Sequence, residues 1–135
     1  MRKKARKSGL LGGVPRSLPA MVKAYRIGEK AASVGFDWEK KEDVWNKVRE
    51  EIAEVDVEIA AHDHDKLEGE IGDLFFALIN ACRLYGIDPE NALERTNKKF
   101  IHRFGYVEQR LNEQGRSFSD ATLDEMESYW QEAKK

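Results

Sequence analysis

The sequence has few residues that cross-link or rigidify a chain and lacks the long apolar runs that cross a membrane. It has one cysteine, Cys82, which excludes an intrachain disulfide, and only three prolines. No apolar run approaches the roughly 20 residues that a membrane-spanning helix needs, and the alternation typical of β-strands is not sustained anywhere. We therefore expect neither a disulfide-rich, nor a membrane-spanning, nor a β-sheet protein, and we predict a cytoplasmic location.

Negative charge exceeds positive charge outside the N-terminal end. The first seven residues carry five lysines and arginines and no acid, whereas the rest of the chain holds 18 of the 23 basic side chains and all 25 acidic ones. So acidic a domain is a poor general binder of nucleic acid, and no nucleic-acid partner is expected. We predict a basic flexible tail or linker at residues 1–17 and one domain at residues 18–135. A nucleic-acid-binding tail is the alternative.

Helical periodicity dominates the remaining sequence. Apolar residues recur at steps of three and four, and helix start and stop signals separate the periodic stretches. Glycines follow two of these stretches, and Thr122 with Glu125 forms a capping box. The predicted helices cover residues 19–34, 42–60, 65–85, 89–112 and 123–133, with a loop at 115–121. Short connections favour antiparallel neighbours, and the predicted fold is all-α, a bundle of four to five helices.

The second and third predicted helices carry the clearest apolar stripes. On the second helix, Val44, Val48, Ile52, Val55 and Ile59 share one face. On the third helix, the segment LFFALINAC is apolar nearly all round. We therefore expect this segment to be buried on most sides, in the centre of a bundle or at a subunit interface.

Acidic residues form a second pattern on these same two helices. At about 100° per residue, each helix presents a carboxylate pair at spacing i, i+3: Glu51 and Glu54 on the second helix, Glu70 and Asp73 on the third. Small residues, Ala77 and Ala81, continue the line of the second pair and would let another helix approach closely. If the two helices pack antiparallel, four carboxylates can meet in one cleft.

Four converging carboxylates indicate a binding site for a hard divalent cation. Oxygen ligands alone suit Mg²⁺ or Mn²⁺ rather than zinc. Because Mg²⁺ held by carboxylates usually takes substrate phosphates as further ligands, the pattern indicates phosphate chemistry. The alternative is a solvated helix flank with ion pairs between residues four apart. No Ser-His-Asp or Cys-His arrangement is evident, so a covalent intermediate is not expected.

The acidic stretches resemble a known family. EEIAE, followed fifteen residues later by EIGD, is similar to the EExxE…ExxD signature of the MazG nucleoside triphosphate pyrophosphohydrolases. Over residues 15–132 the chain resembles the second, catalytic domain of two-domain MazG, through LPAMVKAYRIGEKAASVGFDW, VWNKVREEIAEV, KLEGEIGDLFFALINACR and NKKFIHRF. GGVPRSLPA resembles the linker before that domain. The chain is thus either the catalytic half of a longer protein or a naturally single-domain relative.

The resemblance implies a function and a set of site residues. It implies a MazG-like fold that forms a homodimer through its central helices. It also implies hydrolysis of an NTP or dNTP to a monophosphate and pyrophosphate, in nucleotide-pool housecleaning. It implies Mg²⁺ coordination, with Mn²⁺ as a substitute, by Glu51, Glu54, Glu70 and Asp73. It implies nucleotide contacts from Lys47, Arg49, Glu50, Lys66, Asn97, Lys99, Arg103 and Trp130. Glu50 is our candidate for the base that orients the attacking water, with a surface acid as the alternative.

Several details depart from the family pattern or stay open. Many members read EExxD in the second motif, whereas this sequence has Gly69 in place of the first acid, with Glu68 as a partial replacement of its charge. Lys99 and Arg103, four residues apart on one helix, form either a phosphate clamp or an ordinary basic surface. Trp38 lines either a nucleotide pocket or the core.

Besides the nucleic-acid-binding tail, two alternative functions fit this sequence. The first is a narrow-specificity all-α pyrophosphohydrolase for dCTP, dUTP or phosphoribosyl-ATP. The second is a non-catalytic helical interaction module in which the acids serve metal-linked stability.

Overall fold

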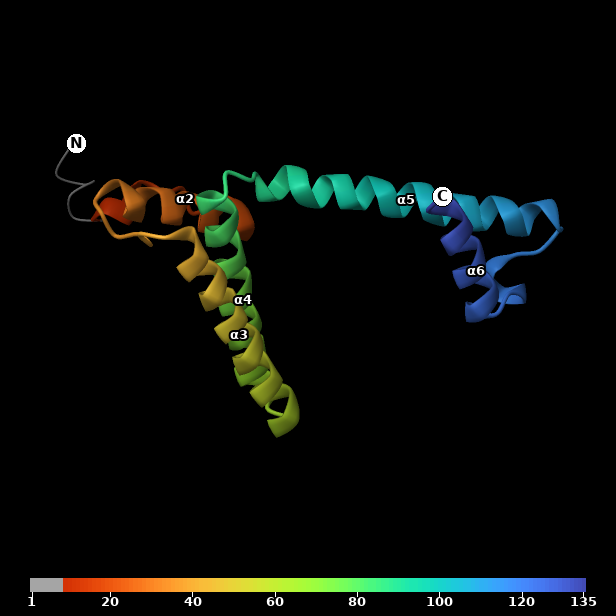
Figure 1. Ribbon diagram of the computed structural model, residues 1–135, viewed down its shortest axis with the longest axis horizontal. Helices are drawn as coiled ribbons and strands as arrows, with labels where there is room; N and C mark the ends of the chain where they lie inside the picture. The colour runs from red at the N-terminus through yellow and green to blue at the C-terminus, as the bar shows by residue number, and fades with distance from the viewer. Residues whose placement is uncertain (1–8) are drawn as a thin grey trace. The chain divides into compact units, whose positions relative to one another are not determined.

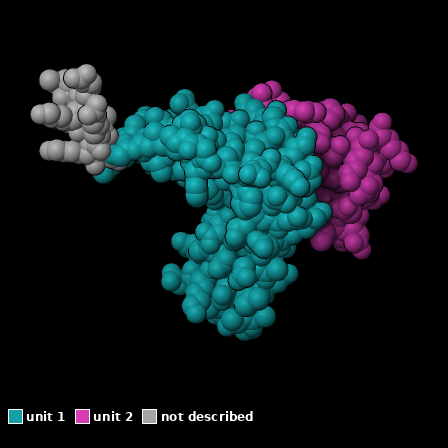
Figure 2. Space-filling model, turned by 60° about the vertical axis from the view of Figure 1, so that its left-hand side comes forward, with its two compact units in different colours: residues 1–89 teal, residues 90–135 magenta. Residues whose placement is uncertain are grey.

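The computed structural model describes residues 9–135, and these fold into two compact units, one ending at Pro89 and the other beginning at Glu90 (Figure 2). Every regular element in this range is helical, which confirms the predicted all-α fold (Figure 1). The elements are η1 (Leu10–Gly13), α2 (Ala20–Ser33), α3 (Lys41–Ala61), α4 (His64–Leu84), α5 (Pro89–Glu113), η2 (Phe118–Asp120) and α6 (Leu123–Ala133).

Helices α3 and α4 form a tight antiparallel hairpin that positions the acidic residues (Figure 1). Only two residues separate the helices. His62 closes α3 in the left-handed conformation, with φ of 57°, and Asp63 caps α4 by accepting a hydrogen bond from the backbone N–H of Lys66 at 3.2 Å. Because the connection is so short, the two helices must pack against each other.

The core of the first unit lies between these two helices. Val44 and Val48 of α3 are buried against Ala77 and Ala81 of α4, with Leu74 and Leu84 packed around them. The small side chains of α4 thus face α3, as predicted from the line that they form with the acids. Helix α2 covers another part of α4.

Only part of the predicted apolar stripe of α3 is buried within the chain. Val44, Val48 and Val55 are buried, but Ile52 and Ile59 are 47% and 53% exposed. The buried face of α3 is therefore rotated from the one predicted, and its remaining buried member is Glu51. Two adjacent stripes compete on this helix, and packing against α4 selects the one that contains the acid.

The LFFALINAC segment is not buried on most sides within one chain, which leaves a subunit interface as the alternative that stays a prediction. Phe75, Phe76 and Leu78 are 53%, 40% and 39% exposed. Helices α2 and α3 cover only part of the circumference of α4, so a broad apolar face of this helix meets solvent.

The second unit is a helix pair joined by a capped loop. Val107 and Leu111 of α5 are its buried residues, and polar contacts tie α5 to α6, among them Tyr106 to Glu132 at 2.7 Å and Gln114 to Tyr129 at 2.6 Å. The predicted capping box forms, because Thr122 Oγ1 accepts from the Glu125 N–H at 3.1 Å and the Glu125 carboxylate accepts from the Thr122 N–H at 3.2 Å.

One short segment differs from its prediction, and the predicted tail is described only in part. The stretch predicted as a loop at 115–121 contains the 3-10 helix η2, which Ser117 and Asp120 hold with a second capping box. The predicted flexible tail falls partly on residues 1–8, which lie outside the described residues. Within its described part, Leu10–Gly13 is a 3-10 helix and Val14 is buried. None of the helices in residues 9–135 has the length and apolar character that crossing a membrane requires.

Candidate active site

Three of the four predicted metal ligands converge on the α3–α4 hairpin. Glu51, Glu70 and Asp73 each offer a carboxylate oxygen, and these oxygens all lie within 4.8 Å of one another. The exposure of the three residues increases across the group: Glu51 is buried, Glu70 is half-buried and Asp73 is exposed. Glu54, the fourth predicted ligand, is exposed one turn along α3 and does not join this group.

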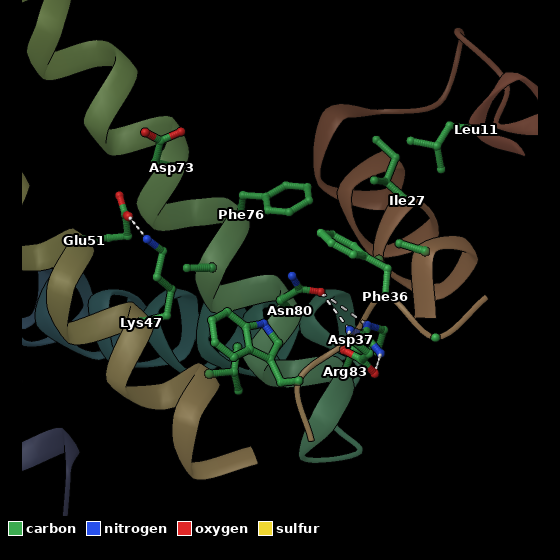
Figure 3. Close-up of a pocket in the computed structure, with 16 residues that line it drawn as sticks. Leu11, Ile27, Phe36, Asp37, Lys47, Glu51, Asp73, Phe76, Asn80 and Arg83 are labelled. Carbon is green, nitrogen blue, oxygen red and sulfur yellow. Dashed lines mark hydrogen bonds and ion pairs between the residues drawn. The ribbon is translucent and has the colours of Figure 1, made fainter. Parts of the chain in front are cut away.

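Glu51 is the residue that makes this cluster unusual. Only 7% of its surface is exposed, and its Oε2 atom has no hydrogen-bond partner among the described residues. Its other oxygen, Oε1, lies 3.1 Å from Lys47 Nζ (Figure 3). A buried carboxylate oxygen without a partner is costly. The unpartnered oxygen and the negative charge of the cluster therefore favour the binding of a cation.

Repulsion inside the cluster appears at Glu70. Desolvation, followed by the negative charges of Asp73, Glu51, Glu54 and Glu58, raises the pKa of the Glu70 carboxyl above its ordinary value. Conversely, the bond to Glu51 raises the pKa of the Lys47 ammonium. Negative charge contributes to both shifts, after desolvation at Glu70 and through the Glu51 carboxylate at Lys47. Three carboxylates with an unpartnered oxygen match the donor set of a hard divalent cation such as Mg²⁺.

A cavity of about 750 Å³ adjoins the acids within the first unit (Figure 3). Glu51, Asp73 and Lys47 line one end of it, and the aromatic rings of Phe36, Trp38 and Phe76 line its walls. Trp38 is thus a cavity residue, and its contact with a nucleotide stays a prediction. The volume is in the range of sites for small molecules.

An ion pair closes the other end of the cavity. Arg83 Nη2 and Nη1 donate to the two carboxylate oxygens of Asp37 at 2.6 and 3.1 Å, and Arg83 also donates to Asn80 Oδ1. This bidentate pair lowers the pKa of Asp37. Sequence analysis missed these residues because Asp37 and Arg83 lie 46 positions apart, and no spacing rule connects a turn residue with the end of a distant helix.

The remaining predicted site residues of the first unit lie around the cluster rather than in it. The Glu50 side chain is 68% exposed and lies 3.6 Å from Lys47. Arg49 donates to Asn46 at 3.1 Å, and Lys66 is exposed in the first turn of α4. The sequence signal for the Lys47–Glu51 pair, a spacing of four on one helix, was present and not used.

In the second unit the structure brings two predicted nucleotide contacts together. The Arg103 guanidinium lies 5.9 Å from the centre of the Trp130 ring, which in turn lies 4.9 Å from the ring of Phe100. Lys99 is exposed one turn before Arg103, and Asn97 donates to Glu94 at 3.3 Å. This arrangement presents a cation over an aromatic face.

Comparison with known proteins agrees with this geometry. The MazG nucleotide pyrophosphohydrolase domain matches residues 39–107, which include both acidic motifs. The chain is 36% identical over 129 residues, 96% of its length, to the nucleoside triphosphate pyrophosphohydrolase/pyrophosphatase MazG of Thermotoga maritima. It is 43% identical over 127 residues, 93% of its length, to the nucleoside triphosphate pyrophosphohydrolase of Escherichia coli K12. It is also 47% identical over 135 residues, 98% of its length, to the Bacillus subtilis protein YabN.

The chain is shorter than these relatives. It spans 49% and 48% of the Thermotoga and Escherichia proteins and 27% of YabN. The domain match covers more than half of the chain, carries both acidic motifs and falls on an all-helical structure. The chain therefore belongs to the MazG nucleotide pyrophosphohydrolase domain family.

Proposed function

We propose that this chain hydrolyses nucleoside triphosphates, NTPs or dNTPs, to a nucleoside monophosphate and pyrophosphate in a Mg²⁺-dependent reaction. The observation that carries the proposal is the buried, unpartnered Oε2 of Glu51, in a three-carboxylate group at the mouth of an aromatic cavity. Relatives named for this activity support it. A role in nucleotide-pool housecleaning, and with it a cytoplasmic location, stays a prediction.

The reaction needs a site that tolerates a highly charged tail. Water loses a proton to a carboxylate base, its oxygen bonds to the α-phosphorus, the bond from that phosphorus to the oxygen bridging the β-phosphate breaks, and pyrophosphate leaves. A cluster of carboxylates alone would repel the triphosphate. When bound, Mg²⁺ neutralises phosphate charge and makes a water more acidic.

The residues of the chain have separable parts in this scheme. Glu51, Glu70 and Asp73 would hold Mg²⁺, or Mn²⁺ in its place, with Glu54 as the fourth predicted ligand near the exposed side of the group. Lys47, paired with Glu51, supplies positive charge beside the phosphates. Glu50 stays the predicted base that orients water, and its exposure leaves it accessible at the rim.

The other predicted nucleotide contacts keep their proposed roles. Arg103 and Lys99 would bind phosphate oxygens, and the Trp130 ring offers a flat apolar surface. Arg49, Lys66 and Asn97 are polar and exposed, which is compatible with contacts to a nucleotide.

We further propose that the partner is a second copy of this chain. The hairpin exposes large apolar side chains, among them Ile52, Ile59, Phe75 and Leu78, on the two helices that also carry the acids. Obligate homodimer interfaces are apolar in this way. Light scattering of a Phe75→Glu variant tests the proposal: the variant should have half the mass of the wild type, and an unchanged mass would contradict it.

Product analysis decides the reaction. The eight common NTPs and dNTPs are offered with and without Mg²⁺ to the wild type, to Asp73→Asn and to Asp56→Asn, a control on the exposed surface of α3. Pyrophosphate and monophosphate should form only with Mg²⁺, and Asp73→Asn should abolish them while Asp56→Asn does not. Orthophosphate would mean attack at the terminal phosphate. No turnover by a folded sample would favour the narrow-specificity enzyme or the binding module.

A further inference from the structure

Asn80 stands at the end of the cavity opposite the acids, with its carboxamide held in one orientation. Its Oδ1 accepts from Arg83 Nε at 3.3 Å and from Arg83 Nη2 at 3.1 Å. Because a guanidinium only donates, the atom that faces it must be the oxygen. Arg83 is fixed in turn by its two bonds to Asp37.

The amide nitrogen is what remains for a ligand. Asn80 Nδ2 has two N–H donors and no hydrogen-bond partner among the described residues, and Figure 3 shows it on the side of the carboxamide away from Arg83, toward Phe76. The cavity therefore presents a fixed donor beside aromatic walls.

Gly28 of α2 provides the space for this arrangement. A Cβ atom at this position would lie 2.6 Å from Asn80 Oδ1 and 3.0 Å from Arg83 Nε. Both distances are shorter than normal contacts, so any larger residue would push the carboxamide out of place. A helix, a turn and a second helix thus meet to hold one side chain.

The spacing along α4 matches the length of a nucleoside. Asn80 follows Asp73 by seven residues, two turns on the same face, which is about 10 Å along the helix axis. A ligand whose α-phosphate lies at the acids would cross the cavity with its sugar and bring its base between the aromatic rings to Asn80. Aromatic faces stack on any base and do not select among them. Selection requires a directed polar group.

We propose that Asn80 is a specificity-determining residue that donates from Nδ2 to a carbonyl oxygen on the base, with Arg83 and Asp37 as its positioning residues. This inference rests on the proposed nucleotide hydrolysis. Because Oδ1 is already used, Asn80 offers no acceptor to an exocyclic amine. If the amide faces the six-position of a purine or the four-position of a pyrimidine, the keto oxygen of guanine, hypoxanthine or uracil accepts this bond, whereas the amine that adenine or cytosine has at that position leaves the donor unpaired.

Inosine and adenosine triphosphates isolate this effect, because the two bases have nearly the same shape and differ at the six-position and at the proton of the adjacent nitrogen. The wild type should have a kcat/KM about three- to tenfold higher for inosine triphosphate, the value of one neutral hydrogen bond. In Asn80→Asp a carboxylate oxygen replaces the donor, and the ratio should fall to one or below. Asn112→Asp, the same change on the exposed surface of α5, should keep the wild-type ratio.

A second variant tests the same substrate preference without a change of charge. Gly28→Ala should shrink the ratio by displacing the carboxamide, whereas Gly105→Ala, where an added Cβ meets no described atom within 4 Å, should not. Ribose 5-triphosphate, which has no base, should be hydrolysed equally by the wild type and Asn80→Asp. A common loss on all three substrates, or a wild-type ratio of one, would overturn the assignment.

Binding without turnover separates this inference from the proposed reaction. Inosine and adenosine monophosphates are titrated into ¹⁵N-labelled wild type, and the side-chain amide signal that Asn80→Asp removes is followed. Tighter binding of the inosine compound with a shift of this signal supports the base assignment even if no triphosphate is hydrolysed, in which case only the proposed reaction fails. Equal affinities, absence of binding, or an unmoved Asn80 signal would refute it.

Discussion

Replacement of Glu51 by glutamine should stabilise the metal-free protein and destabilise the metal-bound one. Three terms decide the metal-free result. The change removes the ion pair with Lys47, whose side chain is 42% exposed, and such partly screened pairs contribute up to about 1 kcal/mol. It also removes a buried carboxylate oxygen without a partner, whose presence destabilises the wild type by about 1–3 kcal/mol. It also relieves repulsion from Glu70 and Asp73.

The balance favours glutamine when no metal is present. The amide N–H groups of glutamine can donate to the neighbouring carboxylates, so the variant should gain about 1 kcal/mol in the free energy of unfolding. Mg²⁺ at 100 times its dissociation constant should then stabilise the wild type by about 2.7 kcal/mol. Since the variant lacks a ligand, it should gain much less, and the order of stability should reverse.

Urea unfolding in EDTA and in Mg²⁺ measures both effects, and hydrogen exchange of the α3 and α4 amides confirms that the change is local to the hairpin. Asp56→Asn, an exposed acid on the same helix, should behave as the wild type in both buffers. A variant less stable than the wild type in EDTA would mean that Glu51 is structural. Equal stabilisation of both proteins by Mg²⁺ would mean that the cluster is not the metal site.

Three further predictions concern parts of the structure outside the cluster. Arg116 lowers the pKa of Glu125 from 4.5 to about 2, so the stability that the Glu125 carboxylate contributes is present above pH 4.5 and is lost as the pH falls toward 2. The difference in melting temperature between wild type and Glu125→Gln should therefore disappear over that range. A difference that stays constant with pH would contradict the role of the charge. Gly69→Ala, where an added Cβ meets no described atom within 4 Å, should raise the free energy of unfolding by about 0.5–1 kcal/mol through helix propensity, as urea unfolding would show. Leu111→Ala, at a position that is 1% exposed, should cost about 2–5 kcal/mol by the same measurement, and a loss below 1 kcal/mol would mean that α5 and α6 do not share a packed core.

The helices and their caps were predictable because they depend on nearby residues. Backbone bonds reach four positions along the chain, and the Thr122–Glu125 box acts over three, so the signals for start, stop and periodicity are all local. The pairing of Glu70 and Asp73 with Ala77 and Ala81 on one line of α4 follows from the same helical geometry.

What local signals left undecided is the rotation of each helix about its axis. On α3 the line through Glu51 and the line through Ile52 lie side by side, and hydrophobicity alone favoured the second. In the structure Val44 and Val48 pack against the alanines of α4, Glu51 is buried beside them and Ile52 is half-exposed. The burial of the Glu51 carboxylate, which favours cation binding, thus depends on both helices together.

The far end of the cavity depended on tertiary structure altogether. The Arg83–Asp37 pair joins residues 46 positions apart. The absence of a side chain at Gly28 matters only because Asn80 of another helix lies against it. A bond between side chains on separate elements requires their relative placement, which no periodicity or motif contains. The sequence alone therefore identified the acids and the chemistry that they favour, whereas only the packed hairpin and α2 showed the cavity beside them and the amide that faces into it.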